Sequence, residues 1–286
     1  MNAVHIMKAY AKINLGLDVL GRLPNGYHEV KMIMQTVGIY DELTVEKTES
    51  GIVLTTDSGE LAADESNLVW KAAKLMMDTY HIQGGVKAHL SKHIPIAAGM
   101  AGGSTDAAAM LKAINLLYEL NIPIRELMRI SVVIGADVPY CVMGGTALAE
   151  GIGEKLSPLP APPPCYLLVA KPDINVSTKY VYQHLDAEGI PHHPDIDGII
   201  GAITQGSLEG ITKRLENVLE KVTIPAHPVI ADIKAKMLSY GAQGSLMSGS
   251  GPTVFGIFAD EATAKEAYRR AVSDELARHI FLTTPV

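Results

Sequence analysis

The sequence predicts an α+β protein with two domains. Strand-like and helix-like segments follow one another in mixed order in both halves of the 286-residue chain, which favours α+β layers over a doubly wound sheet. A proline-rich stretch, residues 156–164, lies between the halves, and because proline this dense fits neither a helix nor a central strand, we expect the stretch to be a connector. We therefore expect an N-terminal domain over residues 1–160 and a C-terminal domain over residues 161–286.

The first domain is expected to open with strands. Residues 10–19 alternate between an apolar face and a mostly polar face that carries Lys12 and Asn14. Residues 24–26, Pro-Asn-Gly, signal a turn. The other elements expected in this domain are strands at 31–37, 42–47, 52–56 and 86–92, and helices at 66–80, 106–120 and 124–134.

The second domain is expected to begin with a strand at 165–170, directly after the prolines. The apolar patterns that follow predict several helices, then two strands within 245–258, a further helix and a last strand. The helices are expected at residues 177–185, 208–222, 228–240 and 261–271.

Composition narrows the class of protein. Apolar residues make up 48% and charged residues 19%, as in globular proteins. The net charge is -7 without a long basic run, so a nucleic-acid partner is disfavoured. Two distant cysteines, Cys141 and Cys165, predict free thiols in a reducing compartment. No apolar run approaches the length of a membrane span, and we expect a cytoplasmic protein without a membrane partner.

A glycine-rich loop is the most informative segment. Its three glycines allow close approach of the backbone to a ligand, and Ser104 and Thr105 are expected to cap the helix that follows. A helix start with free N–H groups attracts anions, so we expect a triphosphate to bind here. The loop comprises Pro95, Ile96, Ala97, Ala98, Gly99, Met100, Ala101, Gly102, Gly103, Ser104 and Thr105.

Other phosphate and nucleophile motifs are absent from the chain. The loop has neither the Gly-Lys-Ser/Thr of a Walker A motif nor G-x-G-x-x-G, and no G-x-S-x-G surrounds Ser104. By itself the loop is equally compatible with a connector that ends in a good N-cap. Residues 246–253, rich in Ser and Gly, form a second candidate loop, for which a hairpin turn is the simpler interpretation.

Asp137 and Lys12 are candidates for proton and charge chemistry. Gly135 is expected to end the preceding helix and Pro139 to prevent its continuation, which leaves Asp137 in a tight turn as a possible general base. Lys12 could neutralise a transferring phosphoryl group. The simpler alternatives are a turn aspartate and a solvated strand lysine. Tyr27 and His28 could hold a base, or simply flank a hairpin.

The joint order of these segments resembles the GHMP kinase superfamily, over nearly the whole chain. The segments are residues 11–15 (Ala-Lys-Ile-Asn-Leu), 26–28 (Gly-Tyr-His), the glycine loop with the Asp-Ala-Ala that follows it, 135–139 (Gly-Ala-Asp-Val-Pro) and 247–253 (Met-Ser-Gly-Ser-Gly-Pro-Thr). The resemblance implies an N-terminal α+β domain that carries ATP and a C-terminal ferredoxin-like domain. It further implies a kinase that uses ATP and Mg²⁺ to phosphorylate a hydroxyl of a cytidyl sugar alcohol, in the non-mevalonate route to isoprenoid precursors.

The resemblance also implies roles for individual residues. Asp137 would be the general base and Lys12 its charge partner, while residues 95–105 would wrap the ATP phosphates. Residues 249–253 would border the site. The residues implied in binding the cytidyl substrate are Tyr27 and His28 on the cytosine, Tyr182 on its other face, and Asn14 on the sugar alcohol.

Some positions depart from the family pattern, and two rival functions remain. Tyr10, Met100 and Thr105 stand where proline, leucine and serine are common in the family. Because Val218 replaces a commoner Asp, we assign Asn217 no role.

One rival function is that of a homoserine-type or mevalonate-type kinase, against which the Gly-Tyr-His segment argues. The other is a non-catalytic nucleotide-binding regulator, against which the joint presence of the lysine and aspartate argues.

Overall fold

The structure is a computed structural model that describes residues 4–24 and 26–286. The chain forms two compact units. The first contains the described residues up to Ala11 together with Ile39–Ile96 and Ala101–Gly144, and the second contains Lys12–Gly38, Ala97–Met100 and Gly145–Val286. The chain therefore passes between the units several times, and a single domain boundary at residue 160 stays a prediction.

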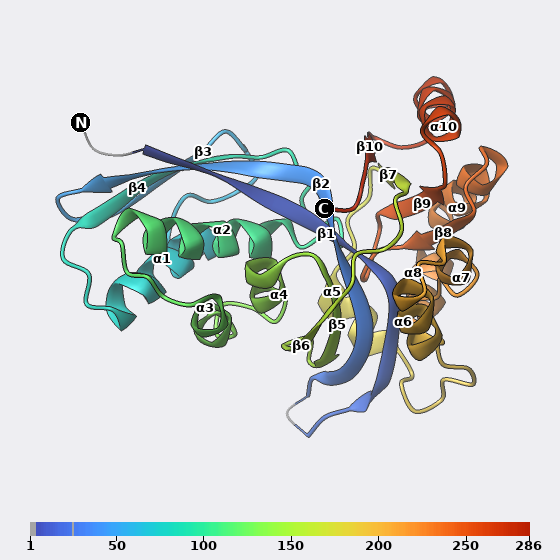
Figure 1. The fold of residues 1–286 in the computed structure, drawn as a ribbon, viewed down its shortest axis with the longest axis horizontal. Coiled ribbons are helices and arrows are strands. Elements are labelled where there is room, and N and C mark those ends of the chain that lie inside the picture. Colours follow the sequence, from blue (N-terminus) through green and yellow to red (C-terminus); the bar gives the residue numbers. More distant parts are fainter. Residues whose placement is uncertain (1–3, 25) are drawn as a thin grey trace. The chain divides into compact units, whose positions relative to one another are not determined.

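Two long strands each contribute to both units (Figure 1). β1 (Val4–Arg22) extends the strand predicted at 10–19 in both directions. β2 (His28–Thr48) is one strand, so the prediction of two separate strands was wrong. Its residues 30–35 pair with β5 (Thr146–Gly151) and residues 42–48 with β4 (Gly85–Ser91), which keeps the whole segment extended.

The predicted turn between these strands lies partly outside the described residues, because Asn25 is not among them. On either side of it, the amide of Leu23 donates to the carbonyl oxygen of Tyr27 at 2.7 Å, and the amide of Gly26 donates to that of Leu23 at 2.9 Å. Gly26 has φ +85°, a conformation that favours glycine. These bonds connect β1 to the Tyr27-His28 segment.

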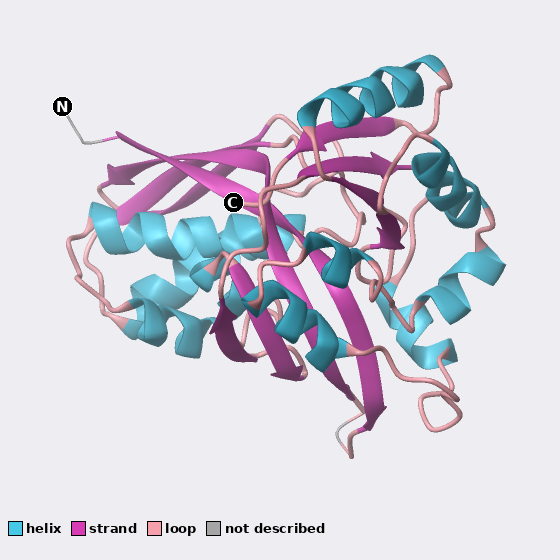
Figure 2. Cartoon of the chain, turned by 45° about the vertical axis from the view of Figure 1, so that its right-hand side comes forward, coloured by secondary structure: helices cyan, strands magenta, loops and turns pink. Residues whose placement is uncertain are grey.

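In the first unit, helices cover one face of the strands (Figure 2). β3 (Gly51–Thr56) pairs in parallel with β4, and β4 pairs antiparallel with the second half of β2. The helices of this unit are α1 (Leu68–Thr79), α2 (Gly102–Leu117), α3 (Ile124–Ser131) and α4 (Val138–Met143).

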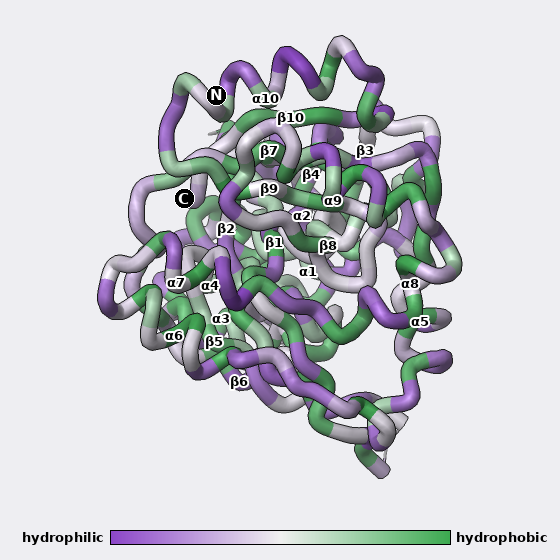
Figure 3. Tube along the Cα trace, turned by 90° about the vertical axis from the view of Figure 1, so that its right-hand side faces the viewer, coloured by the Kyte–Doolittle hydropathy of each residue, from purple (hydrophilic) through white to green (hydrophobic). Residues whose placement is uncertain are grey.

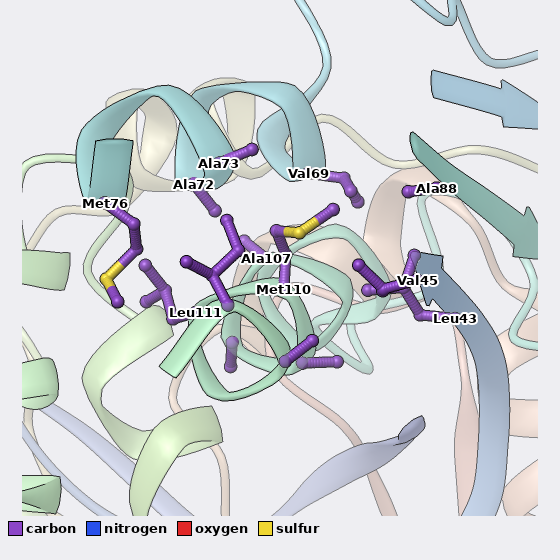
Figure 4. Close-up of a cluster of buried hydrophobic side chains, with 14 of the residues drawn as sticks. Leu43, Val45, Val69, Ala72, Ala73, Met76, Ala88, Ala107, Met110 and Leu111 are labelled. Carbon is purple, nitrogen blue, oxygen red and sulfur yellow. The ribbon is translucent and has the colours of Figure 1, made fainter. Parts of the chain in front are cut away.

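The core of this unit forms where α1 and α2 pack together and against β2 and β4 (Figure 4). α1 buries Val69, Ala72, Ala73 and Met76, at the three- and four-residue spacing of one helix face. The small alanines allow the helices to approach closely. The side chain of Asn67 caps α1 by accepting a hydrogen bond from the amide of Val69 at 2.9 Å.

In the second unit, the first half of β2 continues into β5 and then β6 (Lys155–Leu159). β6 contains Pro158 and pairs only with β5 among the described strands. An edge strand tolerates a proline because its outer N–H groups need no partner. The expectation that all of residues 156–164 form a connector was therefore wrong, and the connector begins only at Pro160.

The rest of the second unit is ferredoxin-like, as the resemblance implied. Its antiparallel sheet has the order β10-β7-β9-β8, with a helix between the first and second strands in sequence and another between the third and fourth. In Figure 3 the trace of the outer helix α10 alternates between hydrophilic and hydrophobic residues. The elements are β7 (Tyr166–Lys171), α9 (Val229–Ser239), β8 (Gly244–Met247), β9 (Val254–Phe258), α10 (Glu261–Ser273) and β10 (His279–Thr283).

The helices between β7 and α9 differ in part from the prediction. α5 (Thr178–His184) is present where expected, whereas α6 (Ile196–Thr204) was missed because it contains two glycines, which disfavour helix. The single helix predicted at 208–222 is wrong. The segment is divided into α7 (Leu208–Thr212) and α8 (Glu220–Ala226), because Asn217 between them pairs with β1.

Both cysteines are free thiols, as predicted, and burial raises the pKa of Cys165 to about 11. In the described part of the chain, no helix has the length and apolar character needed to cross a membrane.

Candidate functional site

The glycine loop has an unusual backbone. Ala97, Gly99 and Ala101 have positive φ values of 52°, 70° and 57°. Non-glycine residues adopt this conformation infrequently, so the surrounding structure must hold the loop in place. α2 begins within the loop's range, at Gly102, and the amides of the first helical turn have no partner within the helix. The loop and helix start together can therefore bind an anion through main-chain N–H groups.

The expected capping by Ser104 and Thr105 is wrong. α2 starts at Gly102, four residues before the predicted start, and its N-cap Ala101 makes no side-chain capping bond. Thr105 is buried, and its hydroxyl donates to the carbonyl oxygen of Tyr10 at 2.6 Å. The hydroxyl of Thr105 thus ties α2 to β1, and the first-turn amides are not occupied by a side-chain cap.

A second loop packs against the glycine loop within the second unit. The hydroxyl of Ser248 donates to the carbonyl oxygen of Gly99 at 3.0 Å. A Cβ atom at Gly99 would lie 2.3 Å from the carbonyl oxygen of Ser248, and one at Gly249 would lie 3.1 Å from the carbonyl oxygen of Gly99. Only glycine fits at the first position, so residues 246–253 do more than form a turn between β8 and β9.

The polar face of β1 is buried. Lys12 is 5% exposed and Asn14 is 0% exposed, which contradicts the alternative of a solvated strand lysine. The ammonium of Lys12 donates to Oδ1 of Asn14 at 2.8 Å, and Nδ2 of Asn14 lies 3.3 Å from Sδ of Met32. The backbone amide of Lys12 donates to the carbonyl oxygen of Met100 at 3.2 Å, so this face of β1 adjoins the glycine loop.

Asp137 is the N-cap of the short helix α4 in the first unit. The expectation that Pro139 prevents a helix was wrong, because proline is tolerated in the first turn, where its missing N–H is not needed. The preceding helix α3 ends at Ser131, before Gly135. Asp137 as a whole is half-buried. Lys12 belongs to the second unit, so joint action of this lysine and Asp137 is a proposal.

Two of the three aromatic residues predicted to bind a base are in contact. The rings of His28 and Tyr182, from β2 and α5, lie 5.2 Å apart between centroids at an interplanar angle of 40°. Tyr27 beside them is 58% exposed. Burial and, to a smaller extent, the charge of Arg22 lower the pKa of His28, so its imidazole is neutral at pH 7. A neutral imidazole can both donate and accept a hydrogen bond at the edge of a base.

Sequence reasoning missed a buried ionic cluster in the first unit. Lys92 pairs with the carboxylates of both Asp41 and Asp106, the latter at 2.8 Å. Asp106 lies in α2, and a Cβ atom at Gly102 would lie 3.3 Å from the ammonium of Lys92. Burial, which outweighs the attraction of Lys92, raises the pKa of Asp106 to about 8. The three residues are far apart in the sequence, and no local pattern connects them.

Sequence reasoning also missed Asn217. This residue is 2% exposed and sits between α7 and α8. Its Nδ2 donates to the carbonyl oxygens of Met247 and Gly249, both at 2.8 Å. No role was expected for Asn217, because its neighbour Val218 replaces a commoner Asp.

Within residues 4–24 and 26–286, no group of three His, Cys, Asp or Glu side chains forms a candidate metal cluster. A divalent cation would therefore depend on ligands that come with a substrate, such as phosphate oxygens and water.

Two protein-family models match separate parts of this chain. The family model described as the GHMP kinases N terminal domain matches residues 67–145, and the GHMP kinases C terminal model matches residues 199–277. The 4-diphosphocytidyl-2-C-methyl-D-erythritol kinase of Lachnospira eligens is 54% identical over 278 residues, which is 97% of this chain and 96% of that protein.

Two solved structures have a similar fold. A crystal structure of 4-(cytidine 5'-diphospho)-2C-methyl-D-erythritol kinase is 32% identical, with a TM-score of 0.84, and the match covers 98% of this chain and 99% of that one. A homoserine kinase from Cytophaga hutchinsonii shares the fold at 21% identity, with a TM-score of 0.81 over 99% of this chain and 94% of that one.

Proposed function

Because the chain belongs to the 4-diphosphocytidyl-2-C-methyl-D-erythritol kinase family of GHMP kinases, we propose that it phosphorylates the 2-hydroxyl of 4-diphosphocytidyl-2-C-methyl-D-erythritol with ATP. The observation that carries the proposal is the similarity over nearly the full length of both chains. The reaction would belong to the non-mevalonate route to isoprenoid precursors.

Binding of the ATP phosphates is assigned to the glycine loop and the start of α2. Support comes from the positive φ values in the loop and from the first-turn amides of α2, which Ser104 and Thr105 do not cap. These groups are fixed before the nucleotide arrives, so little conformational entropy is lost when they engage it.

The chemical step requires a base for the acceptor hydroxyl and positive charge at the phosphoryl group. In our proposal the carboxylate of Asp137 accepts the hydroxyl proton while the substrate oxygen forms a bond to the γ-phosphorus. The bond from this phosphorus to the bridging oxygen breaks, and ADP leaves. Lys12 stabilises the negative charge that spreads over the transferring group. Its burial supports this role, because an ammonium acts more strongly where water is excluded.

Magnesium is expected to accompany ATP. When bound, Mg²⁺ would neutralise part of the charge on the β- and γ-phosphates. The residues of the loop fit this arrangement because they supply main-chain donors to phosphate oxygens, leaving other phosphate oxygens and water to coordinate the ion.

Recognition of the cytidyl substrate is assigned to one group of side chains in the second unit. Tyr27 and His28 would bind the cytosine, with Tyr182 on its other face, and Asn14 would contact the sugar alcohol. The contact between His28 and Tyr182, together with the exposure of Tyr27, supports an aromatic site for a base. A pair of rings 5.2 Å apart leaves no space for a base between them, so one ring must move when cytosine stacks on both sides.

One assay tests the proposal against its rivals. Purified protein with Mg²⁺ and ATP is offered 4-diphosphocytidyl-2-C-methyl-D-erythritol, mevalonate or homoserine, and ADP release is measured. We expect turnover with the cytidyl compound and at most background with the other two. Turnover with mevalonate or homoserine instead would establish another kinase of this superfamily. Nucleotide binding without turnover of any acceptor would favour a regulator.

A further inference from the structure

Asn217 is a buried residue whose side chain bonds the loop that packs against Gly99. Its backbone neighbours are paired with β1, since the amide of Leu17 donates to the carbonyl oxygen of Glu216 and the amide of Val218 donates to that of Leu17, both at 3.0 Å. β1 also carries Lys12, five residues before Leu17. Asn217 is therefore held by the same strand that adjoins the glycine loop.

All the hydrogen-bonding groups of the Asn217 side chain are engaged. Nδ2 donates to the carbonyl oxygens of Met247 and Gly249, and Oδ1 accepts from the amide of Leu219 at 3.0 Å. These partners fix the orientation of the Asn217 side-chain amide. The carbonyl oxygens of Met247 and Gly249 require a donor, and the amide of Leu219 requires an acceptor. The side chain thus clamps the loop of residues 247–251 to the start of α8.

α8 supports the same loop through two more side chains. Oε1 of Glu220 accepts from the amide of Met247 at 2.9 Å, and the hydroxyl of Thr223 donates to the carbonyl oxygen of Ser250 at 3.2 Å. Ser248 and Gly249, which lie between these anchored residues, pack against Gly99.

We propose that Asn217 is a positioning residue for nucleotide binding, which acts by holding residues 247–251 against Gly99 and so fixing the glycine loop. The inference rests on the proposed function, in which that loop binds the ATP phosphates. Loss of the clamp lets the loop adopt conformations that bind nucleotide poorly, and the observed affinity falls with the fraction of competent molecules.

The Asn217→Asp variant tests this inference because it preserves size and removes both donors. A carboxylate would face two carbonyl oxygens, so the loop is expected to move away. We expect the dissociation constant of a non-hydrolysable ATP analogue to rise by about tenfold or more. The dissociation constant of the cytidyl substrate, measured separately, should rise by a clearly smaller factor, because Asn217 bonds Met247, Gly249 and Leu219, none of which is assigned to that substrate.

Asn115→Asp is the matched control. Asn115 also clamps a loop, with Nδ2 and Oδ1 bonded to the carbonyl oxygen and amide of Ile122, both at 2.9 Å. It lies near the far end of α2 from the glycine loop. This variant should lose thermal stability and retain nucleotide affinity, which separates positioning from a general loss of stability.

A second variant keeps the inference testable if Asn217→Asp does not fold. Ser248→Ala removes only the hydroxyl that donates to Gly99, and it should weaken nucleotide binding in the same direction by a smaller factor. If both variants fold, the double variant should weaken binding less than the product of the two factors, because both act on the same contact.

Three results would overturn the inference: unchanged nucleotide affinity in Asn217→Asp, an equal loss for nucleotide and cytidyl substrate, or unchanged affinity in Ser248→Ala when the other variant is unfolded. The readout is binding, so it remains interpretable even if the wild-type protein proves to phosphorylate another acceptor. Failure of the proposed function would appear instead in the acceptor assay with wild-type protein.

Discussion

At the scale of single residues, burial separates two polar side chains of β1 from ordinary surface groups. Lys12 and Asn14 alternate with apolar residues along β1, a pattern that usually places polar side chains in water, yet both are buried. A buried lysine is tolerated only where its charge finds partners. Residues of this kind are candidates for chemistry, and the alternation in the sequence cannot identify them.

Removal of the proposed base should affect turnover far more than binding. Asp137→Asn retains size and the position before α4 but cannot accept the hydroxyl proton. We expect kcat to fall by about 10²–10⁴ while affinity for an ATP analogue stays nearly unchanged. Steady-state kinetics and a binding titration on the same preparation check both expectations. A variant with nearly wild-type turnover would exclude Asp137 as the base.

At the scale of elements, α2 combines two features that favour different residues. Its alanine-rich face packs against α1, whereas its first turn presents free amides and contains Gly102 and Gly103. Glycine weakens a helix, and the ionic cluster beneath the first turn supplies a compensating attachment. Lys92 joins Asp106 of α2 to Asp41 of β2, so the start of the helix is connected to the sheet.

This cluster should make stability depend on pH. The pKa of Asp106 is raised in the folded protein from an ordinary value of 3.8 to about 8, so between these values the folded state binds a proton that the unfolded state has released. The free energy of unfolding contributed by this group is therefore fully present below about pH 4 and decreases as pH rises towards 8, by at most about 1.4 kcal/mol per pH unit.

Asp106→Asn should remove that contribution. Urea unfolding at several values between pH 5 and pH 8 should show a free energy of unfolding that falls more steeply with pH in the wild-type protein than in the variant. Asp78→Asn, which changes an exposed carboxylate paired with Lys74, controls for the loss of one acidic group. Equal slopes for wild type and Asp106→Asn would show that Asp106 is ionised across this range.

At the scale of the whole molecule, the two units share strands. β1 and β2 each begin in one unit and end in the other, and residues 97–100 of the second unit interrupt the first. Neither unit can therefore be excised at a single point without losing strands that belong to it. A cut at residue 160 would leave the C-terminal fragment without the segments of β1 and β2 that belong to the second unit.

Shared strands predict a single cooperative unfolding transition. Each unit carries a natural reporter: the only tryptophan, Trp70, lies in the first unit, and Cys165 is buried in the second. In a Cys141→Ser background, tryptophan fluorescence and reactivity of the Cys165 thiol should change at the same urea concentration. Separate midpoints would show that the units unfold independently.

The sequence by itself determined the family and most of the strands and helices. Such features depend on local periodicity, turn residues and the order of short motifs, all of which are present in a linear chain. The errors were local as well. Capping by Ser104 and Thr105, a break in β2 and a connector throughout 156–164 were inferred from residue preferences that tertiary pairing overrode.

Only the tertiary structure decided which polar residues are buried and what they contact. The cluster of Lys92 with Asp41 and Asp106, and the clamp of Asn217 on Met247 and Gly249, join residues that are 14 to 51 and 30 to 32 positions apart. Their hydrogen bonds form only after strands and helices have packed, because only packing removes the water that would otherwise satisfy these groups. A single sequence contains no local pattern that identifies such contacts between distant residues.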